Sequence, residues 1–255
     1  MIPVIQFDCA PPATLPGGRL MTDGTSAVVL HGVRKAFPLG TGVGLEVLDI
    51  AELSMPAGSW TALRGRSGSG KTTLLNLIAG ISQPTAGTIT VGGADIAAMT
   101  EARRDAFRTR HIGYVFQTFN LLSAFSALEN VMLAMMFTDT VPRRAQRRHA
   151  ADILSRLGLG ERLSHKPDQL SRGEQQRVAI ARALANDPPI VLADEPCGSL
   201  DAHTARDVLT EMLAVCRDAA KTVLVASHDD AVLAAADRVV DMAEINRADA
   251  RHRVA

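Results

Sequence analysis

The stretch 65–73 combines glycines with a lysine and two threonines at the spacing G-x-x-x-x-G-K-[ST] of a phosphate-binding loop. Glycines let successive backbone N–H groups turn toward one anion without obstruction from side chains. Lys71 would bring a positive charge to the β- and γ-phosphates of a nucleotide, and the Thr72 hydroxyl would ligate Mg²⁺. The Lys71–Thr72 pair disfavours the alternative of a chance glycine-rich turn. The predicted nucleotide ligands are Gly65, Arg66, Ser67, Gly68, Ser69, Gly70, Lys71, Thr72 and Thr73.

Two adjacent carboxylates, Asp194 and Glu195, directly follow the apolar run 190–193. Such a run is typical of a buried strand in a parallel sheet, and ligands collect at the carboxyl ends of these strands. Asp194 would support the Mg²⁺ shell, and Glu195 would act as a base on the attacking water, which typically contributes about 10²–10⁴-fold in rate. The alternative is a surface acidic pair, which this position after apolar residues disfavours.

A third candidate is the helix start within residues 170–184. Ser171 and Glu174 have the spacing of a capping box. The free N–H groups of such a helix N-terminus, beside Ser171 and Gly173, form a potential second anion site. The pattern alone does not distinguish this site from an ordinary helix cap.

The surrounding pattern predicts an α/β fold that holds these residues. Residues 60–63 are expected to form the strand before the phosphate-binding loop, and 72–79 the helix after it, ended by Gly80. Apolar and β-branched runs predict further strands at 27–33, 45–53, 88–91, 111–116, 190–193, 222–226 and 239–240. Periodicity predicts helices at 100–110, across 123–186, at 201–218 and at 230–236. Strands that alternate with helices indicate a parallel-sheet core, with a small antiparallel β subdomain and an inserted α-helical subdomain.

We expect one domain over residues 25–245, with the helical subdomain at about 120–185. The proline-rich stretch 1–24 lacks the features of a signal peptide and is predicted to be a disordered tail. Residues 246–255 are predicted to be a short C-terminal tail. The best candidate for a membrane span, 128–137, is too short and too polar to cross a bilayer.

The composition is that of a globular protein, with 47% hydrophobic and 21% charged residues. The formal net charge is zero, so no global attraction to nucleic acid is expected. The three cysteines have no metal-ligand spacing, which favours a reducing compartment. A local basic cluster is either the solvated face of a helix or a contact with lipid headgroups or a partner. Its members are Arg143, Arg144, Arg147 and Arg148.

Over residues 27–243 the chain resembles the ATP-binding subunit of an ABC transporter. Residues 65–73 resemble the Walker A motif of that family, and 191–196 its Walker B motif. Residues 114–117 resemble the Q-loop, and 170–174 resemble the family signature. The remaining matches are the D-loop at 198–201 and the switch histidine in 227–229.

The resemblance implies a P-loop NTPase with a RecA-like core that hydrolyses ATP with Mg²⁺. It implies that Glu195 is the catalytic base, that Lys71 contacts the γ-phosphate, and that Gln117 senses it. His228 would hold that phosphate and the attacking water. The implied metal ligands are Thr72, Gln117 and Asp194. Phe37 matches the aromatic residue that stacks on adenine, although simple packing would also account for a ring there.

The resemblance further implies that two copies bind head to tail, so that each ATP lies between the P-loop of one copy and Ser171 and Gly173 of the other. ATP would join the copies, hydrolysis would separate them through charge repulsion between the products, and the two states would bias a membrane partner. Gln117 would lie next to the groove for that partner. The protein would then be cytoplasmic and peripheral on the inner face of the cell membrane.

The chain departs from the family pattern at three positions. Arg172 replaces the first glycine of the signature, and its side chain is expected to point outward. Glu174 replaces glutamine and keeps the capping role. Cys197 stands where threonine is usual, with no expected consequence.

The stretches 62–80, 112–128 and 130–131 most resemble the lipoprotein-release and macrolide-export branch, whose ATPases pair with FtsX-like permeases. An alternative is an ATP-dependent regulator of a membrane protein that moves no substrate. A DNA-repair ATPase with the same motifs would need a long coiled-coil insertion between its halves. A translation-associated ABC protein would carry two cassettes.

Overall fold

A computed structural model describes residues 26–38 and 44–248 of the chain. The predicted tail 1–24 and most of the predicted tail 246–255 lie outside the described residues. The described strands are β1 (Ser26–Pro38), β2 (Gly44–Pro56), β3 (Trp60–Arg64), β4 (Ala86–Val91), β5 (Ala94–Asp95), β6 (Ile112–Val115), β7 (Ile190–Asp194), β8 (Thr222–Ala226) and β9 (Arg238–Asp241). The described helices are α1 (Lys71–Ile78), α2 (Glu101–His111), α3 (Ala127–Met135), α4 (Arg143–Arg156), α5 (Arg172–Leu184), α6 (Ala202–Asp218), α7 (Asp230–Ala235) and α8 (Met242–Ile245), with a 3-10 turn at Pro167–Gln169.

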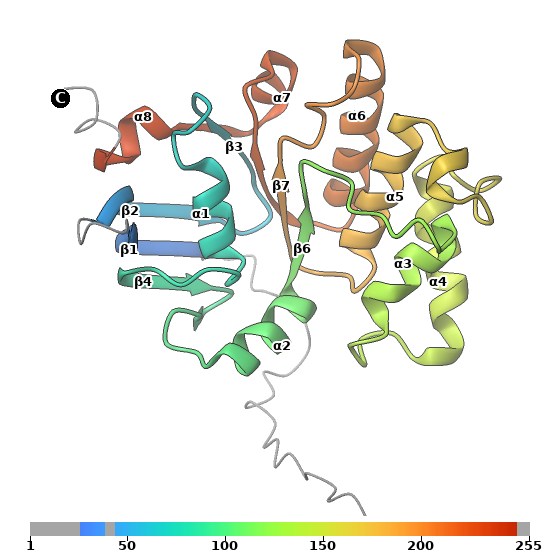
Figure 1. The fold of residues 1–255 in the computed structure, drawn as a ribbon, viewed down its shortest axis with the longest axis horizontal. Coiled ribbons are helices and arrows are strands. Elements are labelled where there is room, and N and C mark those ends of the chain that lie inside the picture. The colour runs from blue at the N-terminus through green and yellow to red at the C-terminus, as the bar shows by residue number, and fades with distance from the viewer. Residues whose placement is uncertain (1–25, 39–43, 249–255) are drawn as a thin grey trace, which may run out of the picture.

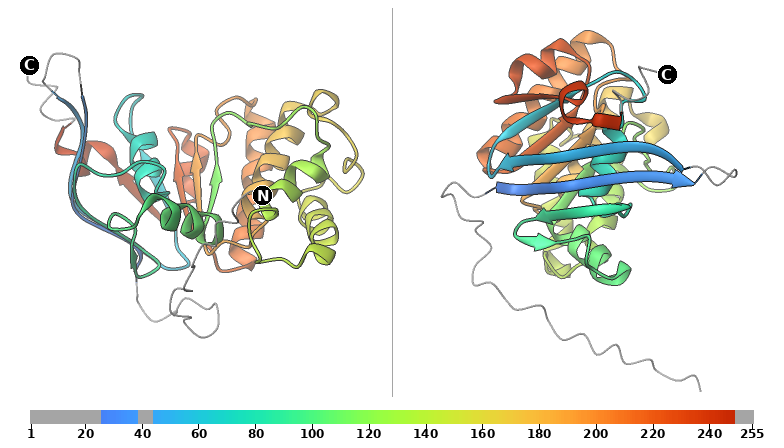
Figure 2. Two further views of the ribbon diagram at one scale, coloured as in Figure 1. Left: turned by 60° about the horizontal axis from the view of Figure 1, so that its bottom comes forward. Right: turned by 90° about the vertical axis from the view of Figure 1, so that its left-hand side faces the viewer.

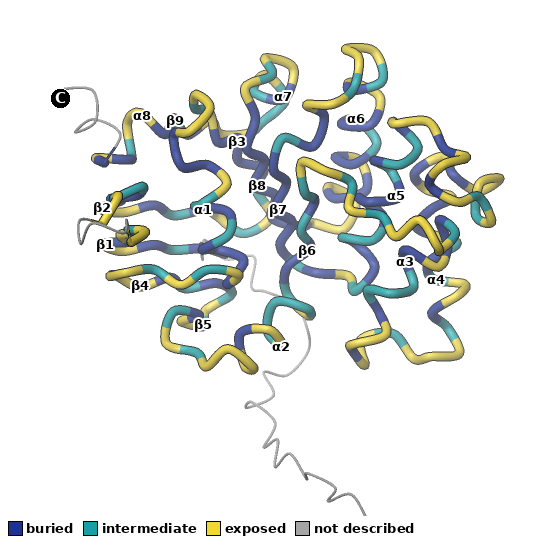
Figure 3. The backbone as a smooth tube through the Cα atoms, viewed as in Figure 1, coloured by how far each residue is buried: buried dark blue, intermediate teal, exposed yellow. Residues whose placement is uncertain are grey.

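The central layer is a parallel sheet with the strand order β6–β7–β8–β3–β9 (Figure 1). Successive side chains of a strand point to opposite faces of the sheet. Val191 and Ala193 of β7 therefore enter one apolar cluster, while Ile190 and Leu192 enter the other. Burial on both faces explains why β7 is a continuous apolar run (Figure 3).

A second, antiparallel sheet has the strand order β2–β1–β4–β5 and lies on one side of the core. Figure 2 shows this sheet facing α1, with the core behind it. Leu30 of β1 and Ile50 of β2 are fully buried in the same cluster as Leu74 and Leu77 of α1. The apolar face of this sheet thus packs on the helix that follows the phosphate-binding loop.

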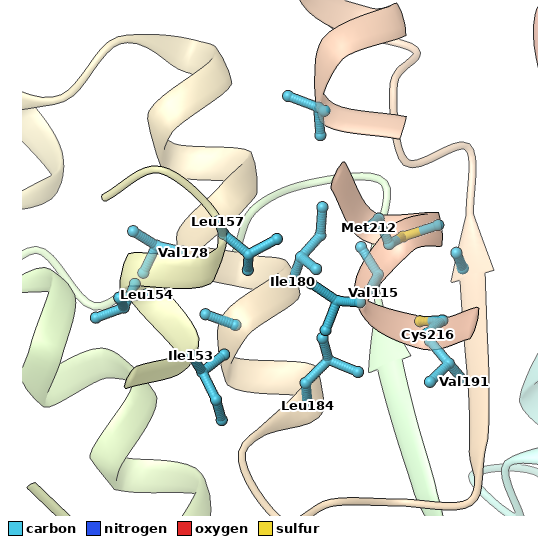
Figure 4. Packing of buried hydrophobic residues seen from close by; sticks show 14 of the residues in the cluster. Val115, Ile153, Leu154, Leu157, Val178, Ile180, Leu184, Val191, Met212 and Cys216 are labelled. Atoms are coloured by element: carbon cyan, nitrogen blue, oxygen red, sulfur yellow. The ribbon is translucent and has the colours of Figure 1, made fainter. Parts of the chain in front are cut away.

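On the other side of the parallel sheet lies the helical subdomain, built from α3, α4 and α5 (Figure 1). Its apolar residues pack with α6 and with the second face of the sheet. Ile153 and Leu157 from α4 and its end, Ile180 from α5, and Met212 from α6 meet in one cluster (Figure 4). Burial of each such side chain contributes about 1.5–3 kcal/mol relative to exposure.

The predicted fold class is confirmed: an α/β P-loop core carries an antiparallel sheet and inserted helices. The region 123–186, predicted to be helical, holds α3, α4, the 3-10 turn and α5, with loops between them. The short elements β5 and α8 carry no clear periodicity and escaped prediction. Asn246, assigned to a tail from sequence, is only 2% exposed and belongs to the folded part.

Candidate functional site

The phosphate-binding loop connects β3 to α1, and its shape requires glycine at residue 70. Gly70 has a φ of 95°, and a Cβ there would lie 2.7 Å from Cδ2 of Leu48. The N–H of Ser69 donates to the carbonyl of Arg66 at 3.2 Å, which closes the loop. The N-terminus of α1, with its positive dipole end, therefore points its N–H groups into the loop, as an anion site requires.

Lys71 is the first residue of α1, and its ammonium group lies inside the loop. Its Nζ donates to the carbonyl of Gly65 at 2.7 Å and to that of Arg66 at 3.3 Å. The same atom lies 3.5 Å from Oε1 of Glu195. The loop thus fixes the lysine charge between two backbone carbonyls and the carboxylate that follows β7.

Asp194 and Glu195 differ in their surroundings. Burial raises the pKa of the Asp194 carboxyl and the neighbouring Glu195 adds to this, while a hydrogen bond from the Thr72 hydroxyl and the charge of Lys71 act in the opposite direction. Glu195 has a φ of 45°, a left-handed conformation that costs a non-glycine residue about 1–3 kcal/mol. The Glu195 side chain lines the same pocket as Lys71 and Thr72.

Two residues after β8, Ser227 and His228, also contact the Glu195 carboxylate. Nδ1 of His228 lies 3.1 Å from both carboxylate oxygens, and the Ser227 hydroxyl donates to Oε2 at 3.4 Å. Ser227 is itself anchored, because its N–H donates to the carbonyl of Leu63 at 3.1 Å. The structure therefore brings together Lys71, Glu195 and His228, which lie far apart in the sequence.

These groups line one pocket of about 430 Å³ at the carboxyl ends of β3, β7 and β8. Its lining residues are Val47, Arg66, Ser67, Gly68, Gly70, Lys71, Thr72, Thr73, Gln117, Asp194, Glu195, Gly198 and His228. Gly65 and Ser69 of the predicted set do not line it. A Cβ on Gly65 would lie 2.5 Å from the Ser69 hydroxyl, so the two residues pack against each other within the loop. Two lining residues were not predicted as ligands from the sequence. Val47 belongs to no motif, whereas Gly198 could have been predicted because it belongs to the D-loop motif.

The pocket contains oxygen donors that suit Mg²⁺. Thr72, Gln117 and Asp194 all line it and offer hydroxyl, amide and carboxylate oxygens, which this hard cation prefers. The hydrogen bond between Thr72 and Asp194 places two of these donors side by side. No group of three or more His, Cys, Asp or Glu within the described ranges could hold a metal ion. The donor set therefore fits a cation that a nucleotide phosphate helps to coordinate.

Phe37 lies apart from the residues that line this pocket. It is near the end of β1 and 42% exposed, and Nζ of Lys35 sits 4.8 Å from its ring centroid. Exposure of this size argues against simple core packing. Its contact with adenine stays a prediction.

Ser171 and Gly173 occupy a second location, at the N-terminus of α5, and do not line the phosphate-loop pocket. The Ser171 hydroxyl accepts from the N–H of Glu174 at 3.2 Å, and the Glu174 carboxylate accepts from the N–H of Ser171 at 2.8 Å. The predicted capping box is present. A Cβ on Gly173 would lie 2.5 Å from Cγ2 of Thr204, so glycine allows α5 to approach the start of α6.

Arg172 is exposed but has a specific partner. Its guanidinium donates to the backbone carbonyl of Ser199 at 3.3 Å. Ser199 precedes α6, so this contact adds to the close approach of Gly173 and Thr204 and joins the starts of α5 and α6. The expectation of an outward side chain holds only in part.

The chain matches the model of the ABC transporter family over residues 48–198. It is 47% identical over 194 residues to the lipoprotein-releasing system ATP-binding protein LolD of Chromohalobacter salexigens, which covers 76% of this chain and 81% of that protein. It is 45% identical over 216 residues to the macrolide export ATP-binding/permease protein MacB of Rhodopirellula baltica, covering 84% of this chain. The chain spans only 31% of that MacB protein.

A solved structure agrees with the sequence comparison. The ATP-binding cassette MJ0796, in a dimeric post-hydrolysis state bound to ADP and Pi, superposes with a TM-score of 0.77 and 36% identity. The superposition covers 84% of this chain and 93% of that cassette. Among the described residues, no helix combines the length and apolarity needed to span a bilayer. The chain therefore belongs to the ABC transporter family, as an ATP-binding and ATP-hydrolysing subunit.

Proposed function

We propose that the chain hydrolyses ATP as a head-to-tail dimer and thereby drives a separate membrane permease. The observation that carries this proposal is the separation of the two anion sites within one chain. Ser171 and Gly173 do not line the pocket of Lys71 and Glu195. A second copy would bring its α5 N-terminus to that pocket and complete it. The dimeric state of the MJ0796 cassette supports this arrangement.

In this dimer the backbone N–H groups of the loop and Lys71 bind the phosphates of ATP. Glu195 takes a proton from the attacking water, and His228, 3.1 Å from the carboxylate oxygens, orients Glu195 and the γ-phosphate. Gln117, which follows β6 at the same edge of the parallel sheet, contacts the γ-phosphate. Because the pocket lies at a sheet edge and a dimer would cover it, water is excluded and these charges act more strongly.

Thr72, Gln117 and Asp194 would hold Mg²⁺. When bound, this cation offsets the negative charge that develops on the phosphate oxygens. The protein contributes the placement of the three oxygen donors. Burial raises the pKa of Asp194 because it disfavours the charged carboxylate. A nearby cation would stabilise that charge.

The membrane partner is proposed from the names of the relatives. One relative is a lipoprotein-releasing system ATP-binding protein, and another carries an ATP-binding part and a permease in one chain. We infer a permease of the FtsX-like class, received in the groove near Gln117, with the ATPase peripheral on the inner face of the membrane. The work done would be export or the release of a lipid or lipoprotein.

The test is ATP-dependent dimerisation of the Glu195→Gln variant, measured by light scattering after size-exclusion chromatography with Mg²⁺ and ATP. The proposal expects a monomer without nucleotide and a dimer with ATP, because slow hydrolysis traps the joined state. The Glu195→Gln, Ser171→Arg double variant is the control and is expected to remain monomeric. A Glu195→Gln protein that binds ATP but stays monomeric would refute the shared site.

A further inference from the structure

A second cavity lies outside the ATP site, in the helical subdomain. Its volume is about 740 Å³, against about 430 Å³ for the phosphate-loop pocket. Three segments form it: the start of α3, the outer face of α4, and the loop before the 3-10 turn. Its lining residues are Ser126, Leu128, Glu129, Arg144, Arg147, Arg148, Ala151, Leu163, Ser164 and Lys166.

The charge of this cavity is strongly one-sided, although the chain as a whole is neutral. Its four cations face a single carboxylate, Glu129, which already accepts from the N–H and hydroxyl of Ser126 at 2.8 Å each. Arg148 has one loose ion pair, at 3.9 Å from Asp152. In the part of the chain that the structure describes, Arg144, Arg147 and Lys166 form no ion pair.

The position of Arg144 does not stabilise α4. Arg144 stands in the first turn of α4, which holds no acidic residue, and a cation there opposes the helix dipole. The field of the cations extends across the cavity. The N–H of Ser126 is the main reason that the pKa of Glu129 is lowered, and Lys166 and Arg147 lower it further. A ligand with negative charge would relieve the repulsion among these cations.

The cavity is built rather than incidental, because hydrogen bonds fix its loop to α3. The N–H of Ala127 donates to the carbonyl of His165 at 2.8 Å, and the N–H of Leu128 donates to the carbonyl of Leu163 at 3.0 Å. These bonds satisfy N–H groups in the first turn of α3 that have no partner within the helix. The loop that supplies Leu163, Ser164 and Lys166 is therefore held in place by α3.

The same loop is connected to the signature of α5. Nε of Arg162 donates to Oε1 of Glu174 at 3.0 Å, and Oε2 of Glu174 accepts from the N–H of Ser171 at 2.8 Å. One carboxylate therefore bridges the loop and the residue proposed to contact ATP in the other copy. A shift of the loop would move Glu174 and, through it, the backbone at Ser171.

We propose that this basic cavity docks an acidic, amphipathic segment of the membrane partner and that Arg162 and Glu174 relay the docking to Ser171. The proposal rests on the proposed function, which supplies the partner. The apolar lining residues Leu128, Ala151 and Leu163 favour apolar side chains in the ligand, while the four cations favour carboxylates. A phosphate group alone would leave most of the volume and the apolar lining uncovered, which favours a peptide over a lipid headgroup.

The docking test uses the full chain and a fluorescent synthetic helix-forming peptide of glutamate and leucine at amphipathic spacing. Its glutamine counterpart controls for charge. Anisotropy at about 0.15 M salt should show binding of the glutamate peptide, weakened about tenfold or more by Arg147→Glu. Arg143→Glu is the matched control, because Arg143 begins the same helix with the same charge but does not line the cavity. Equal loss in both variants, or no peptide binding to wild-type protein, would overturn the docking site.

The relay is tested by ATP turnover. The peptide is expected to change turnover of the wild-type protein several-fold, and to change it much less in Glu174→Gln, which keeps the cap but loses the ion pair with Arg162. An equal peptide effect in both proteins would overturn the relay.

Vesicles of phosphatidylglycerol and phosphatidylcholine test the competing outcome. Vesicle binding that Arg147→Glu abolishes, without peptide binding, assigns the cavity to the membrane surface instead. Wild-type protein that hydrolyses ATP but ignores the peptide contradicts this inference alone, whereas absence of ATP hydrolysis contradicts the proposed function.

Discussion

Nζ of Lys71 and Oε1 of Glu195 lie 3.5 Å apart, and both side chains are largely shielded from solvent. His228 contacts the same carboxylate, with its Nδ1 3.1 Å from both oxygens. The Glu195 carboxylate is therefore held between two groups from different elements, in a strained backbone conformation. Such restraint places the base accurately relative to the attacking water. Single substitutions can test the role of each residue.

Replacement of Glu195 by glutamine should stop turnover while ATP binding persists. The amide keeps the size and hydrogen bonding of the side chain but cannot take a proton, so we expect steady-state hydrolysis to fall by about 10²–10⁴-fold. Phosphate release assays measure this. Substantial residual hydrolysis would remove Glu195 from the role of base.

Replacement of Lys71 by alanine should weaken ATP binding. The change removes a charge-assisted contact with the phosphates, typically about 1.5–3 kcal/mol, or about 10- to 150-fold in Kd. Fluorescent nucleotide titration of the variant checks this, with circular dichroism to establish that it folds. An unchanged titration curve would contradict the assignment of the loop.

Replacement of Ser171 by arginine should impair hydrolysis but leave ATP binding to the monomer intact. Ser171 belongs to the start of α5 and not to the phosphate-loop pocket of its own chain. Titration at nanomolar protein isolates the monomer, and turnover at high protein reports the dimer. Loss of ATP binding in the dilute monomer would count against a role across the dimer.

Replacement of Phe37 by alanine tests the adenine contact. Loss of an aromatic stacking partner should weaken ATP binding by about 0.5–1.5 kcal/mol and leave inorganic triphosphate binding unchanged. The triphosphate is the control, because it lacks the base. Equal affinities of wild type and variant for ATP would indicate that the exposed ring serves another purpose.

Replacement of Arg172 by glycine restores the residue usual in the family. The variant loses the contact with the Ser199 carbonyl, and one such hydrogen bond contributes at most about 1 kcal/mol, so we expect turnover to fall by no more than about fivefold. Monomer affinity for ATP should not change, because Arg172 does not line the phosphate-loop pocket. A variant with full turnover would show that the bridge between α5 and α6 is not needed.

Much of the site could be predicted because motifs encode local chemistry. The phosphate-binding loop, the Asp194–Glu195 pair and the capping box of Ser171 are each contained in one short stretch, and the structure has each of them. The buried strand β8 was predicted with its observed bounds, since a short run of apolar and β-branched residues is typical of a strand buried on both faces of a parallel sheet.

Other features depend on approach between distant segments, which no local pattern encodes. The contact of Arg172 with Ser199 exists because Gly173 lets α5 come close to Thr204. The basic cavity needs α3, α4 and a loop together, so the sequence indicated only the arginine cluster of α4 and not Lys166.

Asn246 has a practical consequence for anyone who shortens or tags this protein. Its side-chain amide donates to the carbonyls of Val47 and Ser69 at 3.0 and 3.2 Å and accepts from the N–H of Asp49 at 2.9 Å. It thus ties β2 to the loop that carries Lys71. A fusion joined after residue 245 would discard this tether and would be expected to loosen the loop. Fluorescent or affinity tags should therefore be attached after residue 248.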